Sequence, residues 1–137
     1  MNPNDRYLET SVLTATPLEL VAMLYRCALE SLGEARRCLA QGDITGRVRP
    51  VNRAFDAITE LSLSLDYEGG GQLSTTLGEL YGYISHKIIL GHTEQSDAHF
   101  AEAMRLLLTL LESWQGIMHT AAQNGAVAAP ATAFAAA

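Results

Sequence analysis

The sequence is poor in aromatic residues, which make up 7% of its 137 residues, and it has only two cysteines and four prolines. No stretch alternates apolar and polar residues for long enough to predict a β-strand. A chain of this length forms one domain that removes roughly two thirds of its surface from water on folding. Neither a disulfide nor a metal is then needed for stability. Because alanine and leucine are abundant instead, we predict an all-α domain.

Positive charge is also scarce: nine lysines and arginines stand against 15 acidic residues, for a net charge of -6. The basic residues are scattered, apart from the pair Arg36-Arg37 and the group Arg47, Arg49 and Arg53. A protein that binds DNA or RNA needs a dense positive stripe along the phosphate backbone. We expect no nucleic-acid binding.

A signal peptide and long apolar runs are missing as well. Residues 1–10 lack the basic-then-apolar pattern of a signal peptide. Residues 113–137 contain no Asp, Glu, Lys or Arg, but most of their apolar residues are alanine, which makes the segment too weakly apolar to span a bilayer. Cys27 and Cys38 lie on one predicted helix, about 16 Å apart along its axis, and cannot bridge each other. These features predict a cytoplasmic protein with reduced cysteines and no membrane insertion.

Residues 14–39 form the most informative segment, because they begin with a complete helix start signal. Thr16 can accept the backbone N–H of Glu19, and the Glu19 carboxylate can reach back to the Thr16 N–H. Pro17 occupies the first helical position, where its missing N–H costs nothing. Gly42 is the expected end of this helix. One face then repeats apolar residues at steps of three and four: Leu18, Val21, Tyr25, Ala28, Leu32, Ala35 and Leu39.

The second predicted helix begins after a capping aspartate, Asp43. Pro50 must either kink this helix or delay its start to about residue 49. The run from Glu68 to Gly71 ends it in an interhelical turn. The apolar residues expected on its inner face are Val51, Phe55, Ile58, Leu61 and Leu65.

The third helix is predicted at about residues 72–89, followed by a loop at 91–95. Gly78 and Gly82 each weaken an exposed helix by ~1 kcal/mol relative to alanine, which suggests that another part of the chain approaches closely there. Ser96 then caps the fourth helix. The third helix should bury Leu73, Leu77, Leu80, Ile84 and Ile88, with Tyr81 and Tyr83 flanking them. The fourth helix should bury Phe100, Ala103, Leu107, Leu110, Trp114 and Ile117.

Four helices with mostly short connections predict an antiparallel up-down four-helix bundle. We place the bundle at residues 14–123, a flexible N-terminal arm at residues 1–13, and a disordered Ala-rich tail at residues 124–137. The apolar surface is wider than one helix–helix seam requires. This surplus is the first indication of a binding function.

The motifs of common enzymes and metal sites are absent from the sequence. No Glu-x-x-His pair of a di-iron bundle occurs, and the four histidines match no zinc spacing. There is also no Gly-x-Ser-x-Gly elbow, no phosphate-binding loop and no thiol-redox motif. We therefore expect no cofactor and no enzyme activity; an enzyme would need a site assembled from scattered residues.

Four blocks of the sequence together resemble the flagellar secretion chaperone family FliS. The first is Thr14-Ala15-Thr16-Pro17 followed by Leu18-Glu19-Leu20-Val21 and Met23-Leu24-Tyr25. The others are Leu65-Asp66 with Glu68 and Gly70-Gly71, then Leu77 with Glu79-Leu80-Tyr81 and Tyr83, and finally Trp114. The blocks lie in the family's order and cover roughly residues 7–118.

The resemblance implies a cytoplasmic chaperone that binds the disordered C-terminal segment of newly made flagellin. Such a protein prevents premature filament assembly and keeps the subunit ready for export. In some members the family also docks on an export-gate component or binds a regulatory protein. A flagellin terminus could lay amphipathic turns into apolar grooves between bundle helices, and ordering it would require a large buried apolar area.

The expected flagellin contacts lie on the arm and on the first and third helices. On the arm we expect Tyr7, Leu8 and Val12 to cover part of the groove in the free protein and to move when flagellin arrives. The other expected contacts are Leu24, Tyr25, Leu77, Leu80, Tyr81, Tyr83 and Ile84. A core role competes with this interpretation at each position on the bundle.

A second hypothesis is a self-associating structural or adaptor bundle, whose surplus leucines bury against a copy of the same chain. A monomer or weak homodimer that takes up one flagellin peptide would favour the chaperone. A stable dimer that ignores the peptide would favour the structural protein.

Overall fold

The computed structural model describes residues 16–123, which form four α-helices. In chain order the helices are α2 (Pro17–Ala40), α3 (Ile44–Leu63), α4 (Gly71–Thr93) and α5 (Asp97–Gln123). The predicted arm, with Tyr7, Leu8 and Val12, and the predicted tail lie outside the described residues.

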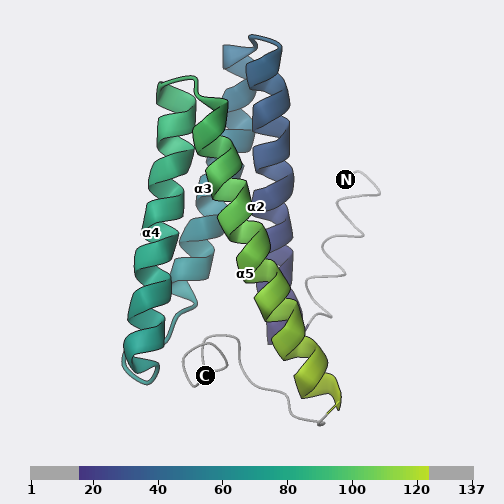
Figure 1. Ribbon diagram of the computed structural model, residues 1–137, viewed down its shortest axis with the longest axis vertical. Coiled ribbons are helices and arrows are strands. Elements are labelled where there is room, and N and C mark those ends of the chain that lie inside the picture. The colour runs from purple at the N-terminus through teal and green to yellow at the C-terminus, as the bar shows by residue number, and fades with distance from the viewer. Residues whose placement is uncertain (1–15, 124–137) are drawn as a thin grey trace, which may run out of the picture.

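The helices pack in a ring in which each contacts two others: α2 contacts α3 and α5, and α4 contacts α3 and α5. Successive helices run in opposite directions, and α5 lies at a slant to the other three (Figure 1). This arrangement confirms the predicted all-α antiparallel bundle. Its core comes from all four helices and includes the fully buried side chains of Tyr25, Ile58, Ile84 and Trp114.

The helix starts follow the predicted capping residues. The Thr16 hydroxyl accepts a hydrogen bond from the Glu19 backbone N–H at 3.2 Å, and Pro17 is the first residue of α2. The Asp43 carboxylate accepts from the Gly46 N–H at 2.8 Å and caps α3. Between these two helices Gly42 has φ of 70°, the left-handed conformation that glycine adopts at low cost.

Helix α3 corrects two predictions. It runs unbroken from Ile44 with Pro50 inside, so the predicted alternative start near residue 49 is wrong. Phe55, placed inside by its spacing, is 36% exposed, whereas Ala54 and Ala57 are buried. Small residues at the centre of the inner face let α3 approach α2 closely, and the large phenyl group is then displaced toward solvent.

The loop predicted at residues 91–95 is wrong for its first three residues, because α4 continues to Thr93. Gly91 is buried inside α4, and a Cβ there would lie 2.6 Å from Cδ1 of Phe100 on α5. This glycine therefore serves close packing between two helices.

Gly78 and Gly82 of α4 were both predicted to lie close to another part of the chain. Only one of them does. A Cβ at Gly78 would lie 2.6 Å from the hydroxyl oxygen of Tyr67, so the turn before α4 packs closely against this glycine. A Cβ at Gly82 would meet no atom within 4 Å. The prediction is confirmed for Gly78 and wrong for Gly82.

The same substitution at two glycines of α4 should have opposite effects on stability. Gly82→Ala should raise the free energy of unfolding by up to about 1 kcal/mol, because alanine favours the helix and the added methyl meets open space. Gly91→Ala should lower it by about 1–3 kcal/mol, because the methyl overpacks against Phe100. Urea unfolding followed by circular dichroism measures both, and equal shifts of one sign would contradict the packing described above.

Candidate functional site

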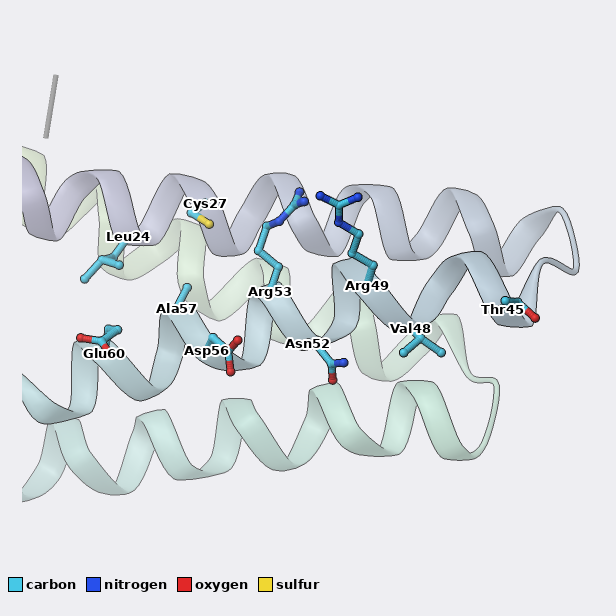
Figure 2. Close-up of a pocket in the computed structure, with 10 residues that line it drawn as sticks. All are labelled: Leu24, Cys27, Thr45, Val48, Arg49, Asn52, Arg53, Asp56, Ala57 and Glu60. Atoms are coloured by element: carbon cyan, nitrogen blue, oxygen red, sulfur yellow. The ribbon is translucent and has the colours of Figure 1, made fainter. Parts of the chain in front are cut away.

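An open groove of about 850 Å³ lies between α2 and α3 (Figure 2). We call it the α2–α3 groove. Its lining residues are Leu24, Cys27, Thr45, Val48, Arg49, Asn52, Arg53, Asp56, Ala57 and Glu60. On α3 the lining extends from Thr45 to Glu60, about 22 Å along the axis or four helical turns.

The floor of the groove is apolar and its rim is charged. Half-buried Leu24 and Cys27 lie one turn apart on α2, and buried Ala57 faces the groove from α3. The rim residues are exposed, and Figure 2 shows Arg49 and Arg53 reaching toward α2. Such a surface can bury the apolar side of an amphipathic segment and leave its polar side in water.

An exposed apolar stripe continues from this groove along the outer face of α3. It consists of Ile44, Val48, Phe55 and Leu63, which are 53%, 44%, 36% and 73% exposed. Their spacings of four, seven and eight residues place them on one side of the helix. This stripe was not predicted from the sequence, although the same periodicity could have found it.

The described residues contain no metal-binding group and two free thiols. In residues 16–123 no group of three or more His, Cys, Asp or Glu side chains is arranged to hold a metal ion. Cys27 and Cys38 are both free thiols and half-buried. We find no nucleophile with an adjacent base along the α2–α3 groove.

The predicted flagellin contacts on the bundle fall into two groups. Leu24 lies in the groove, Leu80 is half-buried on α4, and Tyr83 is 42% exposed. The remaining predicted contacts are buried in the core: Tyr25, Leu77, Tyr81 and Ile84. The structure thus leaves Leu24, Leu80 and Tyr83 accessible to a partner, and Tyr81 does not flank the core as predicted but belongs to it.

Two core tyrosines join α2 to α4 through the centre of the bundle. The hydroxyls of Tyr25 and Tyr81 share a hydrogen bond of 2.5 Å, and their tilted rings lie 6.4 Å apart. Burial raises the pKa of Tyr25 far above its ordinary value and that of Tyr81 to about 12. Both hydroxyls are therefore neutral at physiological pH, and the bond satisfies two polar groups that would otherwise be buried unpaired.

Tyr83 is tied to α5 by a surface network. Its hydroxyl donates a hydrogen bond of 2.6 Å to the Glu102 carboxylate. The same carboxylate forms an ion pair with the Lys87 ammonium at 3.2 Å. The Lys87 ammonium lies 5.4 Å from the centre of the Tyr83 ring. The hydrogen bonds from Tyr83 and Lys87 lower the pKa of Glu102. The exposed ring is thus held in a fixed position on the bundle surface.

A buried arginine fastens the start of α3 to the end of α4. Arg47 is 1% exposed; its Nε donates to Nδ1 of His92 at 3.0 Å and its Nη2 to the His92 carbonyl at 3.2 Å. Its Nη1 is buried without a hydrogen-bond partner. Because Nδ1 accepts a bond from a cation, His92 must be neutral. Burial and the nearby guanidinium both lower the pKa of His92.

The Arg47–His92 contact predicts a loss of stability in mild acid. A histidine whose folded pKa is lowered stabilises the fold fully above its unfolded pKa of about 6.5, and that contribution is lost as the pH falls through the folded value. The melting temperature should therefore fall between pH 7 and pH 5 in the wild type and less in His92→Asn, whose amide oxygen can accept the Arg47 bond at any pH. Thermal unfolding across this range measures the difference. The pKa values of the carboxylates Asp97 and Glu102 are lowered from their ordinary values, so both groups stay charged over this range. Parallel pH profiles would contradict this account.

None of the helices in the described part of the chain is long and apolar enough to cross a membrane.

Comparison with known proteins agrees with this geometry. The family model for the flagellar protein FliS matches residues 1–121. The flagellar secretion chaperone FliS of Salmonella typhimurium is 32% identical over 111 residues, covering 80% of this chain and 82% of that protein. FliSB of Pseudomonas aeruginosa is 30% identical over 82% of this chain and 89% of its own, and FliS of Bacillus subtilis is 26% identical over 83% and 84%. The chain therefore belongs to the FliS family of flagellar secretion chaperones.

Proposed function

We propose that this protein is a cytoplasmic export chaperone that binds the disordered C-terminal segment of flagellin. The α2–α3 groove would receive an amphipathic part of that segment, with its apolar side on Leu24, Cys27 and Ala57. Binding would prevent premature polymerisation and keep flagellin competent for secretion. The observation that carries this proposal is the open groove with an apolar floor and a charged rim.

The dimensions of the groove suit a bound helical segment, which we call the guest. The lining on α3 spans about four turns, enough for a segment of about 15 residues. The apolar stripe of Ile44, Val48, Phe55 and Leu63 adds adjoining surface. A disordered segment pays an entropic cost when it folds on a partner, and a continuous apolar surface can offset that cost.

The other predicted contacts fit this proposal in different ways. Leu80 and Tyr83 would give a second contact area on α4, where Tyr83 is an exposed aromatic held in place by Glu102. The core residues Tyr25, Leu77, Tyr81 and Ile84 would support the bundle, since direct contact with them would require the helices to separate. Tyr7, Leu8 and Val12 of the arm would cover part of the binding surface in the free protein. We also propose docking of the loaded chaperone on an export-gate component.

Calorimetric titration with a flagellin C-terminal peptide tests the proposal. We expect saturable binding of one peptide per chain, with a negative heat-capacity change from burial of apolar surface. A scrambled peptide of equal composition is the control. Binding of both peptides alike, or of neither, would contradict the proposed function.

Self-association is the second candidate, and the exposed stripe on α3 is the observation that favours it. In that case the stripe would bury against the same stripe of a second chain. Light scattering separates the candidates: a stable dimer unaffected by the flagellin peptide favours the structural protein, and a monomer or weak dimer that takes up one peptide favours the chaperone.

A further inference from the structure

The rim charges of the α2–α3 groove are separated along α3. Arg49 and Arg53 lie one helical turn apart in the first half of the lining, and Asp56 and Glu60 lie one turn apart in the second half. All four side chains are exposed. The groove is therefore positive at one end and negative at the other, and its apolar floor residues Leu24, Cys27 and Ala57 lie beside the negative half (Figure 2).

These charges are largely unsatisfied by the protein itself. Within residues 16–123, Arg49, Asp56 and Glu60 make no ion pair, and Arg53 has only Glu34 at 3.8 Å, with both side chains about half exposed. An exposed pair at that distance contributes little.

The arrangement gives α3 one favourable pair, Arg53 and Asp56 three residues apart, and otherwise little benefit. Like charges four residues apart destabilise a helix modestly, and the Arg49/Arg53 and Asp56/Glu60 pairs are both of this kind. Glu60, in the last turn of α3, also opposes the helix dipole. The four charges are thus available to an external partner of complementary charge.

We propose that the guest of the groove is an amphipathic helix with acidic side chains over Arg49 and Arg53 and basic side chains over Asp56 and Glu60. The inference rests on the proposed function, in which this groove is a binding site. Acidic residues near the N-terminus and basic residues near the C-terminus stabilise a helix through its dipole. A segment that is disordered when free folds at lower cost with that order of charges. The guest therefore lies parallel to α3, with its N-terminal end over Arg49.

A designed peptide of 16 residues tests this orientation. It carries leucines on one face, two glutamates in the first turn, two lysines in the last turn and a nitroxide label at its N-terminus. With the full-length chain, the label should broaden the amide NMR signals around Arg49 and spare those around Glu60. The peptide should bind about tenfold more tightly at low salt than one with glutamine at the four charged positions, a gain expected for a few exposed ion pairs, and salt should reduce the difference.

The matched control is a variant with reversed rim charges, Arg49→Glu, Arg53→Glu, Asp56→Arg and Glu60→Arg. It keeps the apolar floor and places a basic residue in the last turn of α3, where it favours the helix dipole, so it should fold. The broadening should then move to the signals around residue 60.

Three outcomes with the designed peptide would overturn the inference: equal broadening at both ends, broadening that does not move in the variant, and no binding of the charged peptide. Binding of the flagellin C-terminal peptide without any preferred orientation would leave the proposed function standing and overturn only this inference.

Discussion

Replacing Trp114 with alanine should lower the free energy of unfolding by about 3–5 kcal/mol, the cost of emptying a large buried aromatic site. The side chain is fully buried in the core cluster, with Leu111 a buried neighbour on the same helix. Its indole N–H donates a 3.0 Å hydrogen bond to the carbonyl of Leu18 in the first turn of α2. The substitution therefore removes core packing and a direct link between the last and first helices of the bundle.

Urea unfolding monitored by circular dichroism measures this loss, because the substitution removes the single tryptophan that fluorescence would follow. Trp114→Phe should lower the free energy of unfolding by less, because an aromatic ring stays in the core and only the hydrogen bond and part of the packing are lost. Leu108→Ala on α5 is the matched control: Leu108 is 49% exposed, so its change should stay within about 0.5 kcal/mol. A loss below 1 kcal/mol in Trp114→Ala would show that this ring does not hold α5 to α2.

Leu24→Asp should weaken binding of the flagellin C-terminal peptide by about tenfold to a hundredfold. Burying a leucine side chain against a partner contributes about 1.5–3 kcal/mol, and each 1.4 kcal/mol corresponds to a factor of ten in the dissociation constant. Leu24 lies in the groove floor and is half-buried in the free protein. A carboxylate there would also lose water when the guest binds, which adds to the cost.

The control for Leu24→Asp is Leu108→Asp, which puts the same charge on an exposed leucine outside the groove lining. Calorimetry should show wild-type affinity for the control and the predicted loss for Leu24→Asp, with helix content unchanged in both variants. If both variants bind the peptide like the wild type, the α2–α3 groove is not the binding site.

Local signals in the sequence predicted the helix starts and most of the core correctly. Caps such as Thr16 and Asp43 act within one turn, so they can be recognised without knowledge of the fold. Regular apolar spacing likewise placed Phe100, Ala103 and Leu107 in the core. The family resemblance was confirmed, and with it the expectation of a non-enzymatic flagellar secretion chaperone.

The errors arose where packing between distant residues overrides a local rule. Gly91 was read as a loop residue, but it meets Phe100 across a helix interface. Phe55 fits an inward stripe, yet neighbouring alanines occupy the close contact with α2. The Arg47–His92 and Tyr25–Tyr81 contacts join residues 45 and 56 positions apart, so no local pattern could reveal them. The α2–α3 groove depends in the same way on how two helices meet.

Alkylation of the two cysteines in the presence of flagellin peptide tests the groove assignment most directly. Cys27 lines the α2–α3 groove, and Cys38, also half-buried on α2, lies outside its lining. Iodoacetamide labelling of the folded protein, followed by tryptic digestion and mass spectrometry of the peptides, reads each thiol separately. A saturating flagellin C-terminal peptide should slow modification of Cys27 severalfold and leave Cys38 unchanged. An unchanged rate at Cys27, with the peptide demonstrably bound, would place the guest elsewhere on the bundle.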